Sequence, residues 1–128
     1  MKYMFYNCSS LDNIIVSEFD TSLVTNMEHM FCGCSNLTSL DIENFKTSKV
    51  ENMSYMFDSC KNIISIKFDN TKFNAEKVKS MEHMFSDCNK LNEIELDIKA
   101  NQVVNMNSMF SNCHALYSLK FGTIFLKY

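Results

Sequence analysis

Cysteine is the residue type of this 128-residue chain with the clearest potential for metal or redox chemistry. Five of the six cysteines recur at intervals of 25 to 28 residues, at Cys8, Cys34, Cys60, Cys88 and Cys113. Structural zinc sites take their ligands in closely spaced pairs, which this interval does not provide. In stacked parallel strands, equivalent residues would lie about 4.8 Å apart, within disulfide reach. A thiol on an apolar face also behaves as a small hydrophobe, so we expect free buried thiols, with disulfides as the alternative.

A local cluster of Cys32, Cys34 and His29 could also ligate a metal ion. Three ligands without a fourth make a weak zinc site, and Cys34 already belongs to the periodic set. His29 and His83 hold equivalent positions in two repeats, which favours solvated surface side chains. The sequence therefore predicts no metal site and no cofactor.

Composition and motifs argue against several functional classes. No nucleophile–base pair, glycine-rich phosphate loop or pair of catalytic carboxylates has a supporting context, so we do not expect an enzyme. The net charge is −3 and arginine is absent, which argues against nucleic-acid binding. No apolar run approaches the roughly 20 residues of a membrane-spanning helix, and no signal peptide is recognisable.

The periodic cysteines end a longer motif, M-x-x-M-F-x-x-C, which occurs five times. Its apolar residues at i, i+3, i+4 and i+7 are typical of one face of a helix. The residue before the motif is Asn26, Asn52, Ser80 or Asn105 in the last four copies, and each can cap a helix start. We therefore predict a two-turn helix in each repeat, which must be held by packing because it is too short to persist alone.

A second motif, L-x-x-L-x-L, follows the first and predicts a half-buried strand. In the second repeat it consists of Leu37, Leu40 and Ile42. A period of this length is typical of arrays in which each unit buries its apolar face against its neighbours. The predicted fold class is α/β: a leucine-rich-repeat solenoid of about five units, each with one parallel strand and one short helix. Residues 1–128 form a single array in this prediction.

The segment before the helix motif carries a more specific string, F-D-T-S-x-V-x-N-M. Residues 19–27 match it and residues 45–53 nearly do, whereas residues 74–76 and 99–101 depart from its D-T-S element. Together with L-x-x-L-x-L, this string resembles the BspA-type leucine-rich-repeat family, in the variant found in mycoplasma surface lipoproteins and other bacterial surface proteins. The resemblance covers essentially the whole chain. It implies a cell-surface or secreted binding module, often adhesive, with no catalytic residues to carry over.

Residues that the repeat leaves free to vary are the candidates for binding a partner. On the exposed face of the predicted sheet they are Asp41, Glu43, Lys67, Asp69, Glu93, Glu95 and Lys120. Four of them alternate in charge at one strand position of successive units, so opposite charges would face each other across strands. A self-neutralising charge ladder is therefore the alternative to a ligand-binding strip. The carboxylates do not converge as a calcium site requires.

The leading functional hypothesis is a non-enzymatic module that binds a protein or glycan partner through its sheet face. The alternative is a structural spacer, or a fragment of a longer array, whose faces bind nothing specific. Terminal repeats normally carry polar caps, and neither end of this sequence shows one, so we also expect end-to-end self-association. The sequence does not identify the partner.

Overall fold

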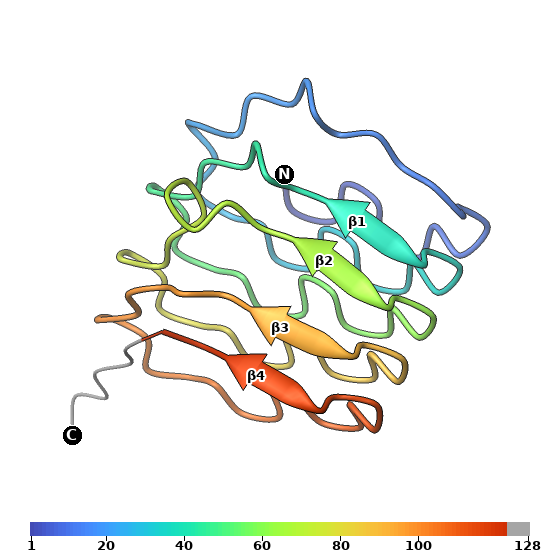
Figure 1. Ribbon diagram of the computed structural model, residues 1–128. Coiled ribbons are helices and arrows are strands. Elements are labelled where there is room, and N and C mark those ends of the chain that lie inside the picture. Colours follow the sequence, from blue (N-terminus) through green and yellow to red (C-terminus); the bar gives the residue numbers. More distant parts are fainter. Residues whose placement is uncertain (123–128) are drawn as a thin grey trace.

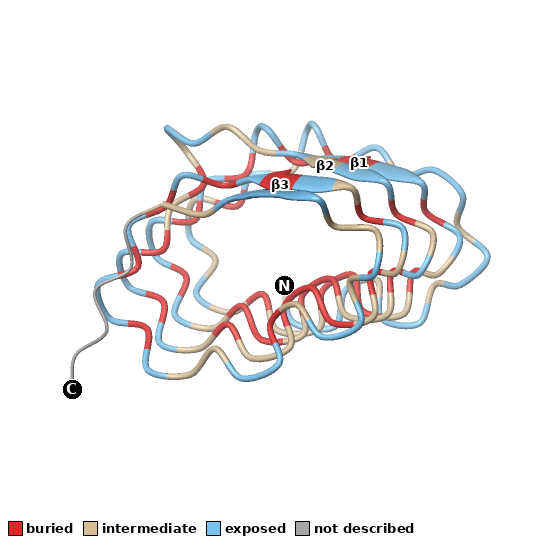
Figure 2. Cartoon of the chain, turned by 60° about the horizontal axis from the view of Figure 1, so that its bottom comes forward, coloured by how far each residue is buried: buried red, intermediate tan, exposed pale blue. Residues whose placement is uncertain are grey.

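The repeats stack on one another and place their strands side by side on one face of the molecule (Figure 1). The computed structural model describes residues 1–122. Its strands are β1 (Ser39–Asp41), β2 (Ser65–Lys67), β3 (Glu93–Glu95) and β4 (Ser118–Lys120). They form two parallel two-stranded sheets, β1–β2 and β3–β4. The strands make up one layer, and the M-x-x-M-F-x-x-C segments make up the layer opposite (Figure 2).

The predicted α/β leucine-rich-repeat solenoid is wrong, because residues 1–122 contain no helix. Regular secondary structure in this range is confined to four strands of three residues each and a few isolated bridges. The first repeat contributes no strand, although residues 11–16 carry the L-x-x-L-x-L pattern. The segments predicted as helices are instead chains of tight turns.

The second repeat shows why the spacing of apolar residues led to the wrong prediction of a helix. The N–H of Met30 donates to the carbonyl of Met27, three residues earlier. Cys32 donates to His29 and Cys34 donates to Phe31 in the same way. His29 and Gly33 have positive φ angles of 56° and 77°. A positive φ at the third residue of a four-residue turn is the pattern of a type II turn. These turns bury the first, fourth, fifth and eighth residues of the motif, which is also the spacing of a helix face.

The other N–H groups of the turn segment bond to the next repeat. Those of His29, Phe31 and Gly33 donate to carbonyls of the third repeat at 2.8 to 3.0 Å. A helix would satisfy such donors internally, four residues back. Turn residues at the seventh motif position favour this alternative, because they tolerate left-handed backbone better than other residues do. They are Asn7, Gly33, Ser59, Asp87 and Asn112, and all five have positive φ.

The predicted helix caps have a different role in the turn structure. The Oδ1 atoms of Asn26 and Asn52 accept the N–H two residues later, both at 2.8 Å. This bond closes a turn that mimics a backbone turn, and it fixes the entry into each M-x-x-M-F-x-x-C segment. Asn26, Asn52, Ser80 and Asn105 are also linked by parallel bridges across the stack.

The core of the stack is a column of aromatic rings. The motif phenylalanines stack face to face, with neighbouring ring centroids 5.3 to 5.7 Å apart and planes within 11° of each other. They are Phe5, Phe31, Phe57, Phe85 and Phe110. Buried methionines lie beside the middle rings, and strand residues such as Leu40 and Ile94 close the core from the opposite layer. Burial of this apolar surface supplies most of the driving force for folding.

Threonine ties the connectors of the early repeats together. The buried hydroxyl of Thr47 donates to the carbonyl of Asn74 at 2.6 Å and accepts the N–H of the same residue at 2.8 Å. Thr21 bonds to Lys46 in the same two ways. In the third and fourth connectors, buried alanines replace these threonines, which explains why the D-T-S element is lost there without loss of packing.

Candidate interaction surface

The sheet face is the surface formed by the outward side chains of the four strands and the residues just after them. It carries six of the seven predicted partner-binding residues. They are Asp41, Glu43, Lys67, Glu93, Glu95 and Lys120, all exposed. The seventh, Asp69, lies in the connector after β2, where its carboxylate accepts the N–H of Thr71 and pairs with Lys72 at 3.3 Å. These contacts, the Thr71 bonds above all, lower the pKa of Asp69.

The alternating charges are split into two pairs. Asp41 faces Lys67 in the β1–β2 register, and Glu95 faces Lys120 in the β3–β4 register. The Lys120 Nζ lies 3.3 Å from Glu95 Oε1, with both side chains more than 60% exposed. The described strands show no pairing between β2 and β3, so Lys67 and Glu95 do not face each other in a ladder. A continuous self-neutralising ladder is therefore not formed.

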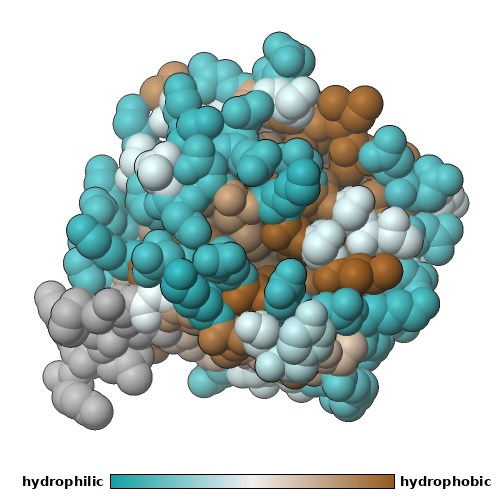
Figure 3. Space-filling model, viewed as in Figure 1, coloured by the Kyte–Doolittle hydropathy of each residue, from teal (hydrophilic) through white to brown (hydrophobic). Residues whose placement is uncertain are grey.

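A shallow depression lies where the two sheets meet, and we call it the junction hollow. Its principal lining residues are Glu43, Lys67, Glu93, Glu95, Ile66 and Phe68. Three carboxylates and one ammonium group surround two half-buried apolar side chains. Polar side chains cover most of this face, with apolar atoms visible between them (Figure 3). The longer spacing between the motifs of the third and fourth repeats, 28 residues, was the sequence signal for an irregularity here.

A second depression on the sheet face lies between the first repeat and β1. Asp41 and Glu43 line it together with Ser39, Ile14 and Ile15. Ile15 is 77% exposed and stands at the strand position that carries charges in the other repeats. Glu43 lines both depressions, so it lies near the centre of the acidic part of the sheet face.

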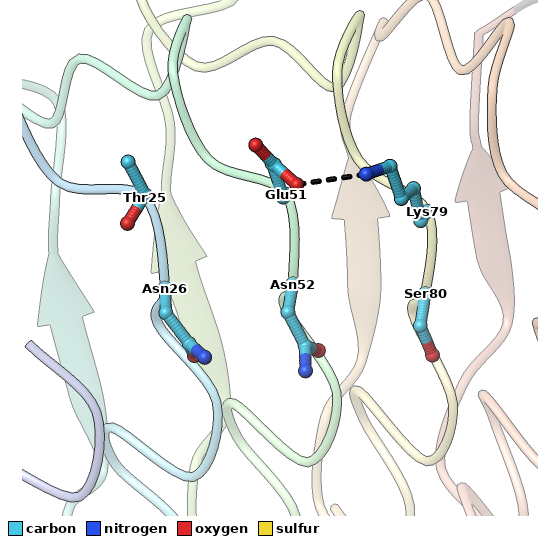
Figure 4. A pocket seen from close by; sticks show the side chains of 6 residues that line it. All are labelled: Thr25, Asn26, Glu51, Asn52, Lys79 and Ser80. Atoms are coloured by element: carbon cyan, nitrogen blue, oxygen red, sulfur yellow. Dashed lines mark hydrogen bonds and ion pairs between the residues drawn. The ribbon is translucent and has the colours of Figure 1, made fainter.

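A polar surface that the sequence did not point to lies along the bridges between repeats. Thr25, Glu51 and Lys79 line it, together with three residues of the bridged column, Asn26, Asn52 and Ser80 (Figure 4). Lys79 Nζ donates to Glu51 Oε2 at 2.8 Å, and this bond lowers the pKa of Glu51. Its charged groups are paired, and the other exposed groups are hydroxyls and amides.

A column of stacked rings runs along the outer side of the turn segments. Tyr3, His29, Tyr55 and His83 stack at centroid distances of 4.6 to 4.9 Å. Tyr55 also donates to Glu82 Oε1 at 3.4 Å, and partial burial, followed by Glu82, raises the pKa of Tyr55. The prediction of freely solvated histidines is thus wrong: His29 is packed between Tyr3 and Tyr55, and His83 is stacked on Tyr55. Neighbouring rings cover each other's faces, so the column offers few ring faces to a ligand.

The cysteines of the described chain are free thiols, and four of the five periodic ones act as hydrogen-bond donors. The Sγ atoms of Cys34, Cys60, Cys88 and Cys113 each donate to a phenylalanine carbonyl of the previous repeat at 3.0 to 3.2 Å. Burial raises the pKa of Cys34 to about 11 and that of Cys60 well above its ordinary value. Such protonated, inaccessible thiols are poor nucleophiles and poor metal ligands.

Cys32 lies outside the periodic set and contacts Asp58 rather than a backbone carbonyl. Its Sγ lies 3.6 Å from Asp58 Oδ2, and burial, followed by this carboxylate, raises the pKa of the Cys32 thiol to about 12. Among residues 1–122, no group of three or more His, Cys, Asp or Glu side chains is arranged to hold a metal ion.

A comparison of the sequence with protein families gives one match. A family model described as "Mycoplasma protein of unknown function, DUF285" matches residues 1–120. No curated protein and no solved structure matches the chain. Over the described residues, no helix has the length and apolar character needed to cross a membrane.

Proposed function

We propose that this chain, which belongs to the DUF285 family of Mycoplasma proteins of unknown function, is a non-enzymatic interaction module that binds a protein or glycan partner through its sheet face. The observation that carries the proposal is the contrast between the two layers. The turn layer repeats the M-x-x-M-F-x-x-C residues five times, whereas the exposed strand position of the sheet face varies, from Ile15 in the first repeat to charged residues of either sign in the other four. A scaffold that keeps its core and varies one face resembles other repeat proteins that bind through an extended surface.

The charge of the sheet face favours a basic partner. Four of the six candidate residues on this face are acidic and two are lysines. Lys120 is paired with Glu95, whereas Glu43 and Glu93 form no ion pair with any of residues 1–122. A lysine or arginine side chain could rest its aliphatic stem on Ile66 and Phe68 while its charge meets Glu43 and Glu93 at the rim of the junction hollow. Within the proposal, a cationic protein segment therefore suits this surface better than a neutral glycan.

A surface or secreted location is part of the same proposal. It is supported by the F-D-T-S-x-V-x-N-M string, which resembles repeats of bacterial surface proteins. Brief protease treatment of intact cells that express the full-length protein would test it. Loss of the chain from intact cells, with cytosolic proteins spared, is the expected result, and full protection would contradict it.

Binding to oligolysine tests the sheet face directly. The wild-type chain should bind the peptide with an affinity that falls as salt is added, because the contacts are between exposed charges. The double variant Glu43→Lys with Glu93→Lys should bind at least about tenfold more weakly, since each reversal replaces an attraction with a repulsion. Isothermal titration calorimetry, with a neutral polysaccharide as a second probe, would measure both affinities.

A matched control separates the sheet face from net charge. Glu18→Lys with Glu76→Lys makes the same change in charge at exposed positions outside the lining of the junction hollow. This control should bind oligolysine almost as well as the wild-type chain. Equal losses in the two double variants would mean that the peptide senses only overall charge. A wild-type chain that binds neither probe would support the structural-spacer alternative.

A further inference from the structure

The polar surface along the bridges between repeats is a depression between two rows of side chains, and we call it the bridge hollow. One row consists of Asn26, Asn52 and Ser80, and the other of Thr25, Glu51 and Lys79 (Figure 4). Each row takes one residue from each of three successive repeats, which parallel bridges hold in register. Neighbouring parallel strands lie about 4.8 Å apart, so the hollow offers polar groups at that regular interval along the stack.

The side-chain amides of Asn26 and Asn52 are available to donate to a ligand. Their Oδ1 atoms accept the N–H two residues later, which fixes the orientation of both side chains. Their Nδ2 groups donate to no acceptor within residues 1–122, and neither group is buried away from solvent. The hollow therefore presents two oriented amide donors on neighbouring repeats.

The charges of the bridge hollow offset each other. Lys79 Nζ donates to Glu51 Oε2 at 2.8 Å, and the other oxygen of this carboxylate has no partner within residues 1–122. None of the six lining residues is apolar. An ionic ligand would have to break the Glu51–Lys79 pair, and an apolar ligand would leave the amides without partners. A neutral ligand rich in hydroxyl groups suits this lining, because each hydroxyl can both donate and accept.

The backbone groups of the hollow are already used between repeats. The N–H of Glu51 donates to the carbonyl of Thr25, and the N–H of Lys79 donates to the carbonyl of Glu51, both at 2.8 Å. The carbonyl of Asn52 accepts the N–H of Met27 at 3.0 Å. A peptide that adds to a sheet depends on unpaired backbone groups, whereas this surface offers side-chain groups. The hollow therefore favours a saccharide over an extended peptide.

We propose that the bridge hollow binds a neutral, extended polysaccharide of β-1,4-linked hexoses that lies along the stack. Sugar hydroxyls accept from Asn26 Nδ2 and Asn52 Nδ2 and donate to Glu51 Oε1. The interval of about 4.8 Å between repeats is close to the length of one pyranose unit in an extended chain, so successive sugars meet successive repeats. This site lies on a different surface from the sheet face and takes a different class of partner, so it does not depend on the proposed function.

Titration of the isotope-labelled chain with cellohexaose and with β-1,4-mannohexaose, followed by NMR, tests the proposal. At least one of the two should bind, with the largest shifts at the backbone and side-chain amides of Asn26 and Asn52. The affinity should hardly change with salt, because no net charge is involved. Maltohexaose should bind more weakly, because its α-1,4 linkages curve the chain away from a straight row of donors.

Replacing both asparagines by serine removes the amide donors and keeps the turns. Ser80 holds the equivalent position in the fourth repeat, where its Oγ accepts the N–H of Glu82 at 3.4 Å. Asn26→Ser with Asn52→Ser should weaken hexasaccharide binding at least about fivefold, through the loss of two hydrogen bonds. The control Asn36→Ser with Asn101→Ser makes the same change at exposed positions outside the hollow and should bind like the wild-type chain.

Oligolysine separates this site from the sheet face. The Asn26→Ser, Asn52→Ser variant should bind oligolysine like the wild-type chain, and the Glu43→Lys, Glu93→Lys variant should keep its affinity for the hexasaccharide. Failure of the wild-type chain to bind either β-1,4 hexasaccharide, shifts centred on the sheet face, or equal losses in the two pairs of asparagine variants would each overturn the proposal. Thermal unfolding of all variants confirms that each affinity is that of a folded chain.

Discussion

The thiol of Cys60 donates a hydrogen bond to the carbonyl oxygen of Phe31, one repeat earlier, with 3.2 Å between Sγ and O. The same carbonyl also accepts the N–H of Cys34, at 3.1 Å. Both lone pairs of a buried carbonyl are thus used, one within the repeat and one between repeats. The cysteine at this motif position therefore links repeats through a directed bond, in addition to filling space.

This bond predicts an unusual ranking of substitutions at Cys60. Cys60→Ala should lower the free energy of unfolding by about 1–3 kcal/mol, through the lost donor and the small cavity. Cys60→Ser should be less destabilising than Cys60→Ala, because its hydroxyl can still donate to the Phe31 carbonyl. Chemical denaturation measures both values. If alanine is tolerated better than serine, the thiol acts only as a hydrophobe.

The phenylalanine column predicts a strong dependence on position along the stack. Phe57 is fully buried between two other rings, so Phe57→Ala should cost about 3–5 kcal/mol. Phe5 is only partly buried, and Phe5→Ala should cost distinctly less. Urea denaturation of the two variants under the same conditions gives the comparison. Similar costs at the two positions would argue against a continuous column.

The turn geometry predicts different effects for one substitution at two nearby serines. Ser108 and Ser111 are both exposed, but only Ser108 has a positive φ, of 55°. Ser108→Val should destabilise the chain by about 1–2 kcal/mol, because left-handed backbone is costly for residues other than glycine and a β-branched side chain adds crowding. Ser111→Val should change stability by less than about 0.5 kcal/mol. Equal effects would favour a helical conformation of the fifth motif over the turns.

The buried thiols predict a loss of stability at alkaline pH. Burial raises the pKa of Cys32, Cys34, Cys60 and Cys88 above the ordinary value of 9.0, so these groups stay protonated in the folded chain. In the unfolded chain they ionise near their ordinary pKa. Their contribution is therefore fully present below pH 9.0 and is lost as the pH rises above it. Urea denaturation between neutral and alkaline pH should show this decline.

A thiol-deletion control isolates that effect from the titration of lysine and tyrosine. The double variant Cys60→Ala with Cys88→Ala should be less stable at neutral pH but should lose less stability on going to alkaline pH. An identical slope in the variant and the wild-type chain would mean that the buried thiols do not cause the decline.

The sequence predicted some features of this molecule because they depend on side-chain pattern alone. The strand residues around Leu40 and Ile94 and the charged positions opposite each other in β1–β2 and β3–β4 follow from alternation and repeat length. The helices were predicted wrongly because Met27, Met30, Phe31 and Cys34 have the same inward spacing in successive turns as in a helix. The positive φ at the third and seventh positions distinguishes the turns from a helix, and only the seventh, occupied by Asn, Gly, Ser or Asp, carries residue types that signal it in the sequence.

The candidate surface was predicted in composition but not in geometry. The missing pairing between β2 and β3 and the hollow beside it are features of backbone geometry, which side-chain pattern does not specify. The Tyr–His column was also missed as a structure. The sequence alignment of the repeats already places His29, Tyr55 and His83 at one motif position, but that position was predicted to be solvated, so the stacking of these rings with one another and with Tyr3 was missed.

The replacement of Thr47 by Ala75 at the equivalent place in the next repeat has a consequence for how the chain can change length. Thr47 holds the following connector through two hydrogen bonds to Asn74. The side chain of Ala75 is a methyl group, which packs against the connector after it but forms no hydrogen bond. A loop inserted before Asn74 would break this directed link, whereas one inserted at the exposed turn residues Asn101 and Gln102 would break no threonine link of this kind. The later connectors are therefore the places where a peptide tag or a foreign epitope can be added at the least cost in stability.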